Sequence, residues 1–425
     1  MDSTAIYEEG LFINNEYVKS LSEETLTVRN AYDQSILSSD IQVAGQADVD
    51  LAVKCARDAF QTWRFSPTRV RVEAMLNCAK IFESRSDEIA KLESICMGCP
   101  MMLATKVAST LSGYFRYYAG LVDKVHGETY AEDEDGLFKM ILREPLGVCA
   151  GIAGWNATPI FAGLKIAAAV AAGNTVVFKS SEKSPLGTLY LGAIFKEAGF
   201  PPGVINLLSG GPTTGSLLAS HMGVAKISFT GSREAGKKVQ IAAATSNLKH
   251  VSLELGGKSA SIVFSDAAFE NAVLHNSRMF LLNNAQVCSA ASRVLVQDAI
   301  ADKFVSALRD SFRSASPGDP SDPETMFGPL ADTEQASRVR SFIKDAESQG
   351  LQVVAGGSGQ SSIENWVQPT IFYNPPESSA VYKQEVFGPV LTVNTFSTET
   401  EAIAMANNSC YGLAGKLHFI SLGLP

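Results

Sequence analysis

The feature that most constrains the fold is an alternation of short apolar runs with helix-like stretches after residue 147. The apolar runs have the length of buried strands, and helix-like stretches occupy residues 162–171, 185–199 and 213–220. Strands that alternate with helices in this way predict an α/β fold, with a mostly parallel sheet covered by helices on both faces. The apolar runs are residues 148–153, 175–178, 204–208 and 225–229.

The flanking regions predict a second domain. Residues 11–19 have the pattern of a β-hairpin, and residues 46–125 are helical in pattern. After Gly256-Gly257 a second α/β set begins, with strands at 259–264 and 293–297, a helix from Ala299, and loops at 316–323 and 355–362. A chain of 425 residues is too long for one ordinary core. We therefore expect two α/β domains with a boundary near residue 256.

Charge and cysteine usage exclude several classes of function. The net charge of −9 argues against nucleic acid or an anionic membrane as a partner. No secretory or mitochondrial signal is visible, and no apolar segment is long enough to span a membrane. Seven cysteines at irregular spacing suit a reduced, cytoplasmic protein. Cys96 and Cys99 form an isolated CxxC that we interpret as two incidental thiols, and the scattered histidines predict no metal site.

One cysteine stands out by its surroundings. Cys288 lies in the segment 281–293, LLNNAQVCSAASR, among small polar residues that are not typical of core packing. A reactive cysteine sits in a polar, partly accessible place, whereas a structural one has apolar neighbours. The neighbours in question are Asn283, Asn284, Gln286, Ser289 and Ser292.

Two segments suggest a bound nucleotide. Residues 229–236, FTGSREAG, place a strand before Gly231 and Ser232 and a helix that contains Gly236. Such a helix start favours a pyrophosphate, although a plain strand-turn-helix has the same pattern. The strand at 175–178 delivers Lys179 and Glu182 to its carboxyl end, where parallel sheets bind ligands. A carboxylate there accepts hydrogen bonds from ribose hydroxyls and repels a 2′-phosphate, which favours NAD over NADP.

Two more side chains supply groups that a nucleophile needs. Glu254, in SLELGG, is a carboxylate at an apolar strand end, followed by glycines that allow close approach. Asn156, in AGWNATP, follows a buried strand and has an amide that can donate to an oxyanion. Together with Cys288 they offer a base, an oxyanion donor and a nucleophile. The alternative for each is structural: an asparagine in a turn and a glutamate that caps a helix.

In the order of these motifs the chain resembles the NAD(P)-dependent aldehyde dehydrogenase superfamily. The resemblance covers nearly the whole chain, to about Gly415. It rests on GWNATP (154–159), AAGNTVVFKSSE (171–182), EAGFPPGVINLLSG (197–210), FTGSREAG (229–236), LELGGKS (253–259), QVCSAASR (286–293) and EVFGP (385–389).

The resemblance implies a fold and a reaction. It implies an NAD-binding, Rossmann-type domain (1–126 and 145–256), a bridging or oligomerisation segment (127–144) and a catalytic domain (257–425). Cys288 would add to an aldehyde, and Asn156 would hold the oxyanion. Glu254 would activate the water that hydrolyses the thioester, or help to deprotonate the cysteine. Lys165 would be a further catalytic residue. Cofactor contacts are implied for Trp155, Lys179, Ser181, Glu182, Gly231, Ser232, Gly236, Leu255, Glu385 and Phe387.

Two departures from the family pattern matter. Ala157-Thr158 and Leu164 are smaller than the residues usual in relatives, which predicts a wider tunnel and a bulky or aromatic aldehyde. After Gly415 the chain runs KLHFISLGLP, so we expect the C-terminal part of the catalytic domain to be missing, together with the strand that joins subunits. The expected homo-oligomer is then in doubt, and an uncovered sheet edge is expected. A truncated, non-catalytic relative that keeps nucleotide binding is the alternative function, and a CoA-acylating enzyme is a third.

Overall fold

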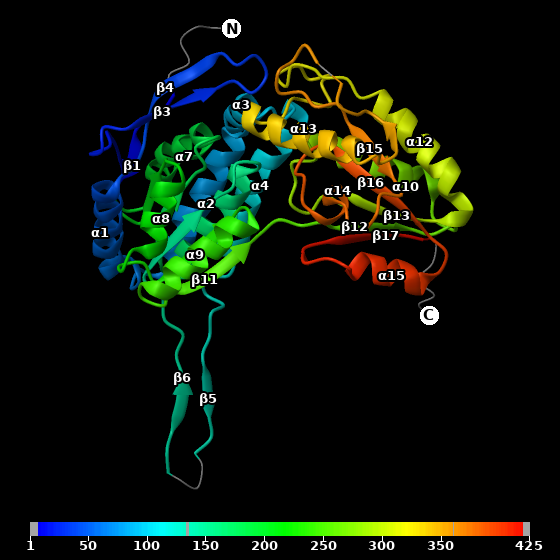
Figure 1. Cartoon of the computed structure of the whole chain (residues 1–425). Helices are drawn as coiled ribbons and strands as arrows, with labels where there is room; N and C mark the ends of the chain where they lie inside the picture. Colours follow the sequence, from blue (N-terminus) through cyan, green and yellow to red (C-terminus); the bar gives the residue numbers. More distant parts are fainter. Residues whose placement is uncertain (1–6, 133–135, 360, 420–425) are drawn as a thin grey trace. The chain divides into compact units, whose positions relative to one another are not determined.

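The chain divides into two compact α/β units (Figure 1). The computed structural model describes residues 7–132, 136–359 and 361–419. Unit 1 comprises residues 1–29, 36–93 and 104–254, and unit 2 comprises residues 30–35, 94–103 and 255–425. Each unit is built around its own sheet.

Five parallel strands form the centre of the seven-stranded sheet of unit 1, in the order β11-β10-β7-β8-β9. All residues of β7, β8 and β9 are buried, as predicted from their apolar runs. The chain proceeds from β7 to β9 on one side and returns to the other side at β10, so the strand order reverses between β7 and β10. The strands are β7 (Val148–Ile152), β8 (Thr175–Lys179), β9 (Ile205–Leu208), β10 (Lys226–Thr230) and β11 (His250–Glu254).

Helices cover both faces of this sheet. On one face lie α1 (Gln46–Trp63), α8 (Pro212–Ser220) and α9 (Arg233–Thr245), and on the other lie α5 (Thr158–Ala162), the π-helical turn η1 (Gly163–Ala167), α6 (Ala168–Ala171) and α7 (Pro185–Glu197). The predicted stretch 162–171 is therefore not one regular helix. It contains a π-turn, a distortion that often marks functional sites.

The predicted hairpin at 11–19 is confirmed. Strands β1 (Leu11–Ile13) and β2 (Glu16–Val18) are joined by Asn14 and Asn15, whose φ angles are 56° and 64°. Positive φ at both turn residues is what a type I′ hairpin requires, and asparagine tolerates it. The hairpin extends the sheet because β1 pairs antiparallel with β9. A separate two-stranded sheet consists of β3 (Thr25–Arg29) and β4 (Ile36–Gln42).

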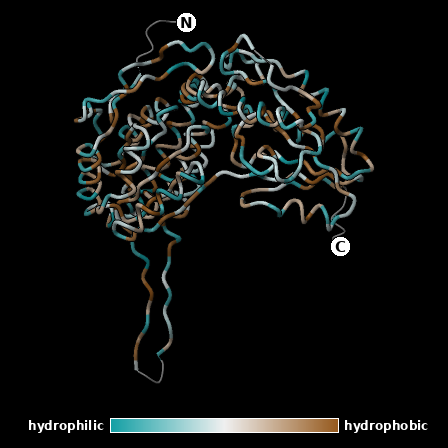
Figure 2. The backbone as a smooth tube through the Cα atoms, viewed as in Figure 1, coloured by the Kyte–Doolittle hydropathy of each residue, from teal (hydrophilic) through white to brown (hydrophobic). Residues whose placement is uncertain are grey.

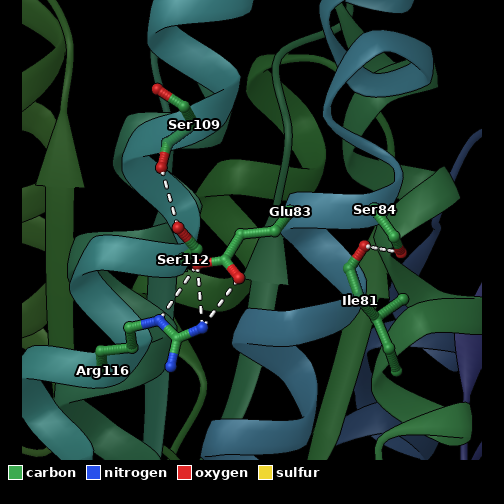
Figure 3. A network of polar contacts seen from close by, with 6 residues as sticks. All are labelled: Ile81, Glu83, Ser84, Ser109, Ser112 and Arg116. Carbon is green, nitrogen blue, oxygen red and sulfur yellow. Dashed lines mark hydrogen bonds and ion pairs between the residues drawn. The ribbon is translucent and has the colours of Figure 1, made fainter.

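The helical region 46–125 contains α1, α2 (Thr68–Ser84), α3 (Ser86–Met97) and α4 (Met101–Ala119). Within unit 1 the carboxylate of Glu83 on α2 accepts hydrogen bonds of 2.8–3.1 Å from the guanidinium of Arg116 on α4 (Figure 3). The Ser112 hydroxyl beside them bonds the Ser109 carbonyl at 3.1 Å. Because the ion pair is solvent-exposed, it contributes little to stability.

A long two-stranded arm extends from the rest of unit 1 (Figure 1). It contains β5 (Glu128–Tyr130) and β6 (Lys139–Ile141), which pair antiparallel. Hydrophobic residues are concentrated on the β6 side of the arm (Figure 2), and they are exposed to solvent. These exposed residues are Leu137, Phe138, Met140, Ile141 and Leu142.

Unit 2 is built on a six-stranded sheet in the order β14-β15-β16-β13-β12-β17. Its strands are parallel except for β14, and β17 pairs with β12 at one edge. Strand β17 is one edge of this sheet and has one neighbour among the described strands. The strands are β12 (Ala260–Val263), β13 (Arg293–Gln297), β14 (Val353–Ala355), β15 (Thr370–Tyr373), β16 (Val390–Phe396) and β17 (Gly415–His418).

The helices of unit 2 pack against this sheet around a core that includes Phe304, Leu308 and Phe312 of α12. The helix predicted from Ala299 is α12, which a 3-10 turn precedes. No helix in the described ranges is long and apolar enough to cross a membrane. The helical elements are α10 (Phe269–Asn276), α11 (Arg278–Leu281), η2 (Leu282–Ala285), η3 (Asp298–Ile300), α12 (Ala301–Arg313), α13 (Thr333–Ser348), α14 (Ala380–Lys383) and α15 (Glu399–Asn407).

Candidate active site

The loop that carries Asn156 lies at the point where the strand order of unit 1 reverses, directly after β7. The Ser184 hydroxyl holds this loop, since it donates to the Trp155 carbonyl at 3.0 Å and lies 2.8 Å from the Thr158 hydroxyl. Ser184 and Thr158 are both buried. The predicted oxyanion donor is thus carried on a loop fixed from the β8–α7 connection, at the edge of the sheet where ligands of such folds bind.

Lys165 lies on the π-turn η1 and reaches across the sheet. Its ammonium donates to the Ser228 hydroxyl on β10 at 2.9 Å. Burial lowers the pKa of Lys165 to about 8, the charge of Glu254 opposes this change, and the charge of Lys226 adds to it. Lys165 and Glu254, both predicted to be catalytic, therefore interact electrostatically within unit 1.

The surroundings of Glu254 differ from the prediction. The sequence suggested a carboxylate inside an apolar strand end, but Glu254 is solvent-exposed. The reason is its place on β11, the edge strand of the sheet, in which exposed and half-buried residues alternate. Its backbone carbonyl accepts a hydrogen bond of 3.1 Å from the Gly231 amide, which places Glu254 beside the turn after β10.

Lys179 and Glu182 lie at the carboxyl end of β8, as predicted. The Lys179 side chain is buried, and its ammonium is 3.7 Å from a carboxylate oxygen of the half-exposed Glu182. Burial lowers the pKa of Lys179, and the Glu182 carboxylate acts in the opposite direction. The buried Ser181 hydroxyl lies 3.3 Å from the same carboxylate. An ammonium, a hydroxyl and a carboxylate therefore meet at one strand end, a set that can bind sugar hydroxyls.

The turn after β10 has the predicted strand–turn–helix form. The Ser232 hydroxyl caps α9, because it accepts a hydrogen bond from the Ala235 amide at 3.2 Å. Gly231 also has a packing role, since a Cβ there would lie 2.6 Å from the ring of Phe229. Gly236 is buried in the first turns of α9. A helix start of this form is suited to an anionic group.

The polar neighbours of Cys288 correct one premise of the sequence analysis. Asn283, Asn284 and Gln286 are buried, not exposed. The Gln286 side chain donates to the Asn283 carbonyl at 3.0 Å and accepts from the Ala331 amide at 3.0 Å. The Asn284 amide donates to the Gly328 carbonyl. Polar side chains can be buried here because they satisfy the backbone of an irregular turn.

This turn holds three consecutive non-glycine residues, Asn283 to Ala285, at φ angles of 54°, 50° and 54°. Such left-handed residues are uncommon and cost free energy, and they cluster at functional sites. Cys288 follows three residues later and is half-buried, in accord with the partly accessible place expected of a reactive thiol.

Gly256 and Gly257 form a cradle for two other parts of unit 2. The Cys288 carbonyl oxygen lies 2.7 Å from where a Cβ on Gly257 would be. The Glu385 carboxylate occupies the corresponding space over Gly256 and accepts a hydrogen bond from the Gly257 amide at 3.1 Å. The structure thus brings the predicted nucleophile and a predicted cofactor-binding carboxylate to adjacent glycines. Any larger residue at either position would displace one of them.

Charged and strained groups surround Glu385. Burial raises its pKa, whereas the Gly257 amide, Arg338 and Lys258 lower it. Arg338 on α13 donates to the carbonyls of Glu385 and Val386 at 2.8 and 2.5 Å. Phe387 has a φ of 58°, and its carbonyl accepts from Gln335 at 2.7 Å.

Several participating residues were missed by sequence reasoning: Ser184, Ser228, Gln335 and Arg338. No local pattern marks them, because each acts through a contact made in the fold. Leu255, a predicted cofactor contact, is the first residue of the longest segment of unit 2 and is half-buried. Cys96 and Cys99 are both buried.

A sheet with this strand order, polar groups at its carboxyl edge and a thiol that follows a strained turn are features of nucleotide-using α/β enzymes. Comparison with known proteins specifies the class further. The aldehyde dehydrogenase family model matches residues 17–419. An aldehyde dehydrogenase from Davidiella tassiana is 41% identical over 97% of this chain and 84% of that protein. Human retinal dehydrogenase 2 is 41% identical over 96% of the chain and 79% of its own length.

Solved structures agree. Indole-3-acetaldehyde dehydrogenase AldA of P. syringae, determined in complex with NAD+ and IAA, has a TM-score of 0.95 at 36% identity, covering 99% of this chain and 86% of that one. The chain belongs to the aldehyde dehydrogenase family. It is an enzyme with the α/β fold of that family, an oxidoreductase that acts on an aldehyde with a nicotinamide dinucleotide.

Proposed function

We propose that this chain oxidises an aldehyde to the carboxylic acid through covalent catalysis by Cys288. The observation that carries the proposal is the Gly256-Gly257 cradle, over which the Cys288 backbone and the Glu385 carboxylate both pass. The Cys288 thiolate adds to the aldehyde carbon, and the resulting oxyanion receives hydrogen bonds from the Asn156 amide and the Cys288 backbone N–H. Loss of hydride leaves a thioester on Cys288, and Glu254 activates the water that hydrolyses it.

The cofactor we propose is NAD, which when bound accepts the hydride. The residues present fit a dinucleotide. Lys179 and Glu182 meet at the carboxyl end of β8, where they suit the hydroxyls of the adenosine ribose. Glu385, held by the Gly257 amide, suits the second ribose. Because the Glu182 carboxylate would repel a 2′-phosphate, we propose a preference for NAD over NADP.

We propose a bulky or aromatic aldehyde as the substrate. The small residues Ala157 and Thr158 adjoin Asn156, and Leu164, which is exposed, precedes Lys165. The names of two relatives are consistent with this class, since one is a retinal dehydrogenase and another an indole-3-acetaldehyde dehydrogenase. A higher kcat/KM for short linear aldehydes in a series of chain length and ring size would contradict this proposal.

We further propose that the arm at residues 127–144 pairs with a second copy of the chain. Its β6 side exposes Leu137, Phe138 and Met140 to solvent, a costly arrangement for a free monomer. Size-exclusion chromatography with light scattering tests this: Phe138→Ser should lower the mass of the assembly if the arm is an interface, and a monomeric wild-type chain would contradict it.

The first experiment on the reaction is NADH formation by the purified chain with a panel of aliphatic, aromatic and amino aldehydes. We expect turnover that Cys288→Ala abolishes. Cys410→Ala is the matched control, because Cys410 is an exposed thiol at a site with no proposed role. Soluble, folded protein without turnover on any aldehyde, but with NAD binding, would favour the non-catalytic alternative.

A further inference from the structure

Ser228 is a residue of β10 that the proposed mechanism does not use. Its hydroxyl accepts the hydrogen bond of the Lys165 ammonium at 2.9 Å. Lys165 reaches it from the π-turn η1 by lying over β7, where Gly151 leaves room. A Cβ on Gly151 would be 3.4 Å from the Lys165 side chain and 2.7 Å from the Phe178 ring. The Lys165 side chain therefore crosses β7 at Gly151, and its ammonium ends at the Ser228 hydroxyl.

The register of the sheet relates this end point to Glu254. Ser228 pairs with Gly151 on one side and with Ser252 on the other. Glu254 follows Ser252 by two residues and therefore points to the same face of the sheet as Ser228. Thr230, paired with Glu254, lies on that face too, and its buried hydroxyl has no hydrogen-bond partner among the described residues. Hydroxyls therefore line the face between the lysine and the carboxylate.

We propose that Ser228 is a positioning residue for Lys165. It holds the Lys165 ammonium at the level of Ser252, two residues before Glu254 on β11, so that the positive charge stabilises the Glu254 carboxylate that takes a proton from water. This inference rests on the proposed function and deepens it. The fixed ammonium attracts the Glu254 carboxylate and holds it in place, and the proton that the carboxylate takes from water passes to solvent, to which the exposed Glu254 side chain is open. Of the charged groups known to act on Lys165, Glu254 favours its charged form, whereas Lys226 on the same strand as Ser228 disfavours it.

The role should be confined to hydrolysis of the thioester. In Ser228→Ala the lysine loses its anchor and can move by about 1 Å or more. We expect thioester hydrolysis to slow by about tenfold to a hundredfold. The burst of NADH from the first turnover and the KM values for NAD and aldehyde should stay near those of the wild type. The limb of the pH–kcat profile that reports Lys165 should also shift. Ser228→Thr keeps the hydroxyl and should restore most of the rate.

Ser252→Ala is the matched control. Ser252 is the ladder neighbour of Ser228 and is exposed. If Ser228 acts by anchoring the lysine, Ser252→Ala should leave the hydrolysis rate near that of the wild type. An equal loss in both variants would overturn the proposal, because it would show that any hydroxyl of this row serves.

A readout without turnover separates this inference from the proposed function. The rate of acetylation of Lys165 by acetic anhydride is measured by peptide mass spectrometry, with Lys226 of the same chain as internal reference. We expect Ser228→Ala to change the labelling of Lys165 severalfold and that of Lys226 little. Unchanged labelling would overturn the positioning role even in an active enzyme. If Ser228→Ala changes the labelling of Lys165 but not the rate of thioester hydrolysis, the role of Ser228 in hydrolysis is overturned. A wild-type chain without turnover would refute the proposed function but not the positioning of Lys165 by Ser228. If Ser228→Ala does not fold, Ser228→Cys serves in its place.

Discussion

Glu93 is a buried carboxylate whose ionisation should make the stability of unit 1 depend on pH. It lies on α3, its side chain is 2% exposed, and neither carboxyl oxygen has a hydrogen-bond partner among the described residues. A Cβ on Gly187 of α7 would be 2.9 Å from one of these oxygens. Burial raises the pKa of Glu93 to about 8, while the backbone N–H of Thr158, at the start of α5, opposes the rise.

The magnitude follows from the shift. From 4.5 to about 8 is roughly 3.5 pH units, and each unit corresponds to about 1.4 kcal/mol. The ceiling is therefore roughly 5 kcal/mol, and relaxation of the surroundings reduces it to a few kcal/mol. Because the pKa is raised on folding, the stabilisation is complete below pH 4.5, where the carboxyl is protonated in both states. It is lost progressively as the pH rises to about 8.

Glu93→Gln removes this dependence, since the amide is neutral at every pH and similar in shape. We expect the variant to gain little relative to wild type near pH 5 and about 5 °C or more in Tm near pH 8.5, from a few kcal/mol in a domain of this size. Circular dichroism at both pH values measures it. Asp87→Asn, on the exposed side of the same helix, is the control. An equal change in Tm at the two pH values would refute the reasoning.

Two further predictions concern the site. Gly257→Ala would place a methyl group 2.7 Å from the Cys288 carbonyl oxygen, so kcat should fall by about tenfold or more. The control is Gly113→Ala, whose new methyl group has no atom within 4 Å and which should leave kcat unchanged. Steady-state kinetics of both variants tests this prediction. Glu182→Gln removes the charge that would repel a 2′-phosphate, so the ratio of kcat/KM with NADP to kcat/KM with NAD should rise by about tenfold. The control is Glu197→Gln, at an exposed position at the end of α7, which should leave this ratio unchanged.

The sequence by itself determined the elements and their class. The apolar runs at 148–153 and 175–178 are β7 and β8, because the burial of a parallel strand on both faces requires apolar residues throughout. Asn14-Asn15 determined a hairpin, because few residues tolerate positive φ. The sequence also placed Lys179 at the end of a strand, because this lysine directly follows the apolar run at 175–178. These features depend on neighbours in the chain, so a local pattern carries them.

Only the tertiary structure decided which polar groups are buried and what they contact. Asn284 and Gln286 before Cys288 resemble a solvated loop in the sequence but are buried, because the Gly328 carbonyl and the Ala331 amide, more than forty residues away, form hydrogen bonds with their side chains. Glu254 resembles a buried strand end but lies on the edge strand β11. Ser228 and Glu93 carry no signal at all. The reason is that burial and hydrogen bonding depend on the order and register of strands distant in sequence, which the periodicity of a single strand does not encode.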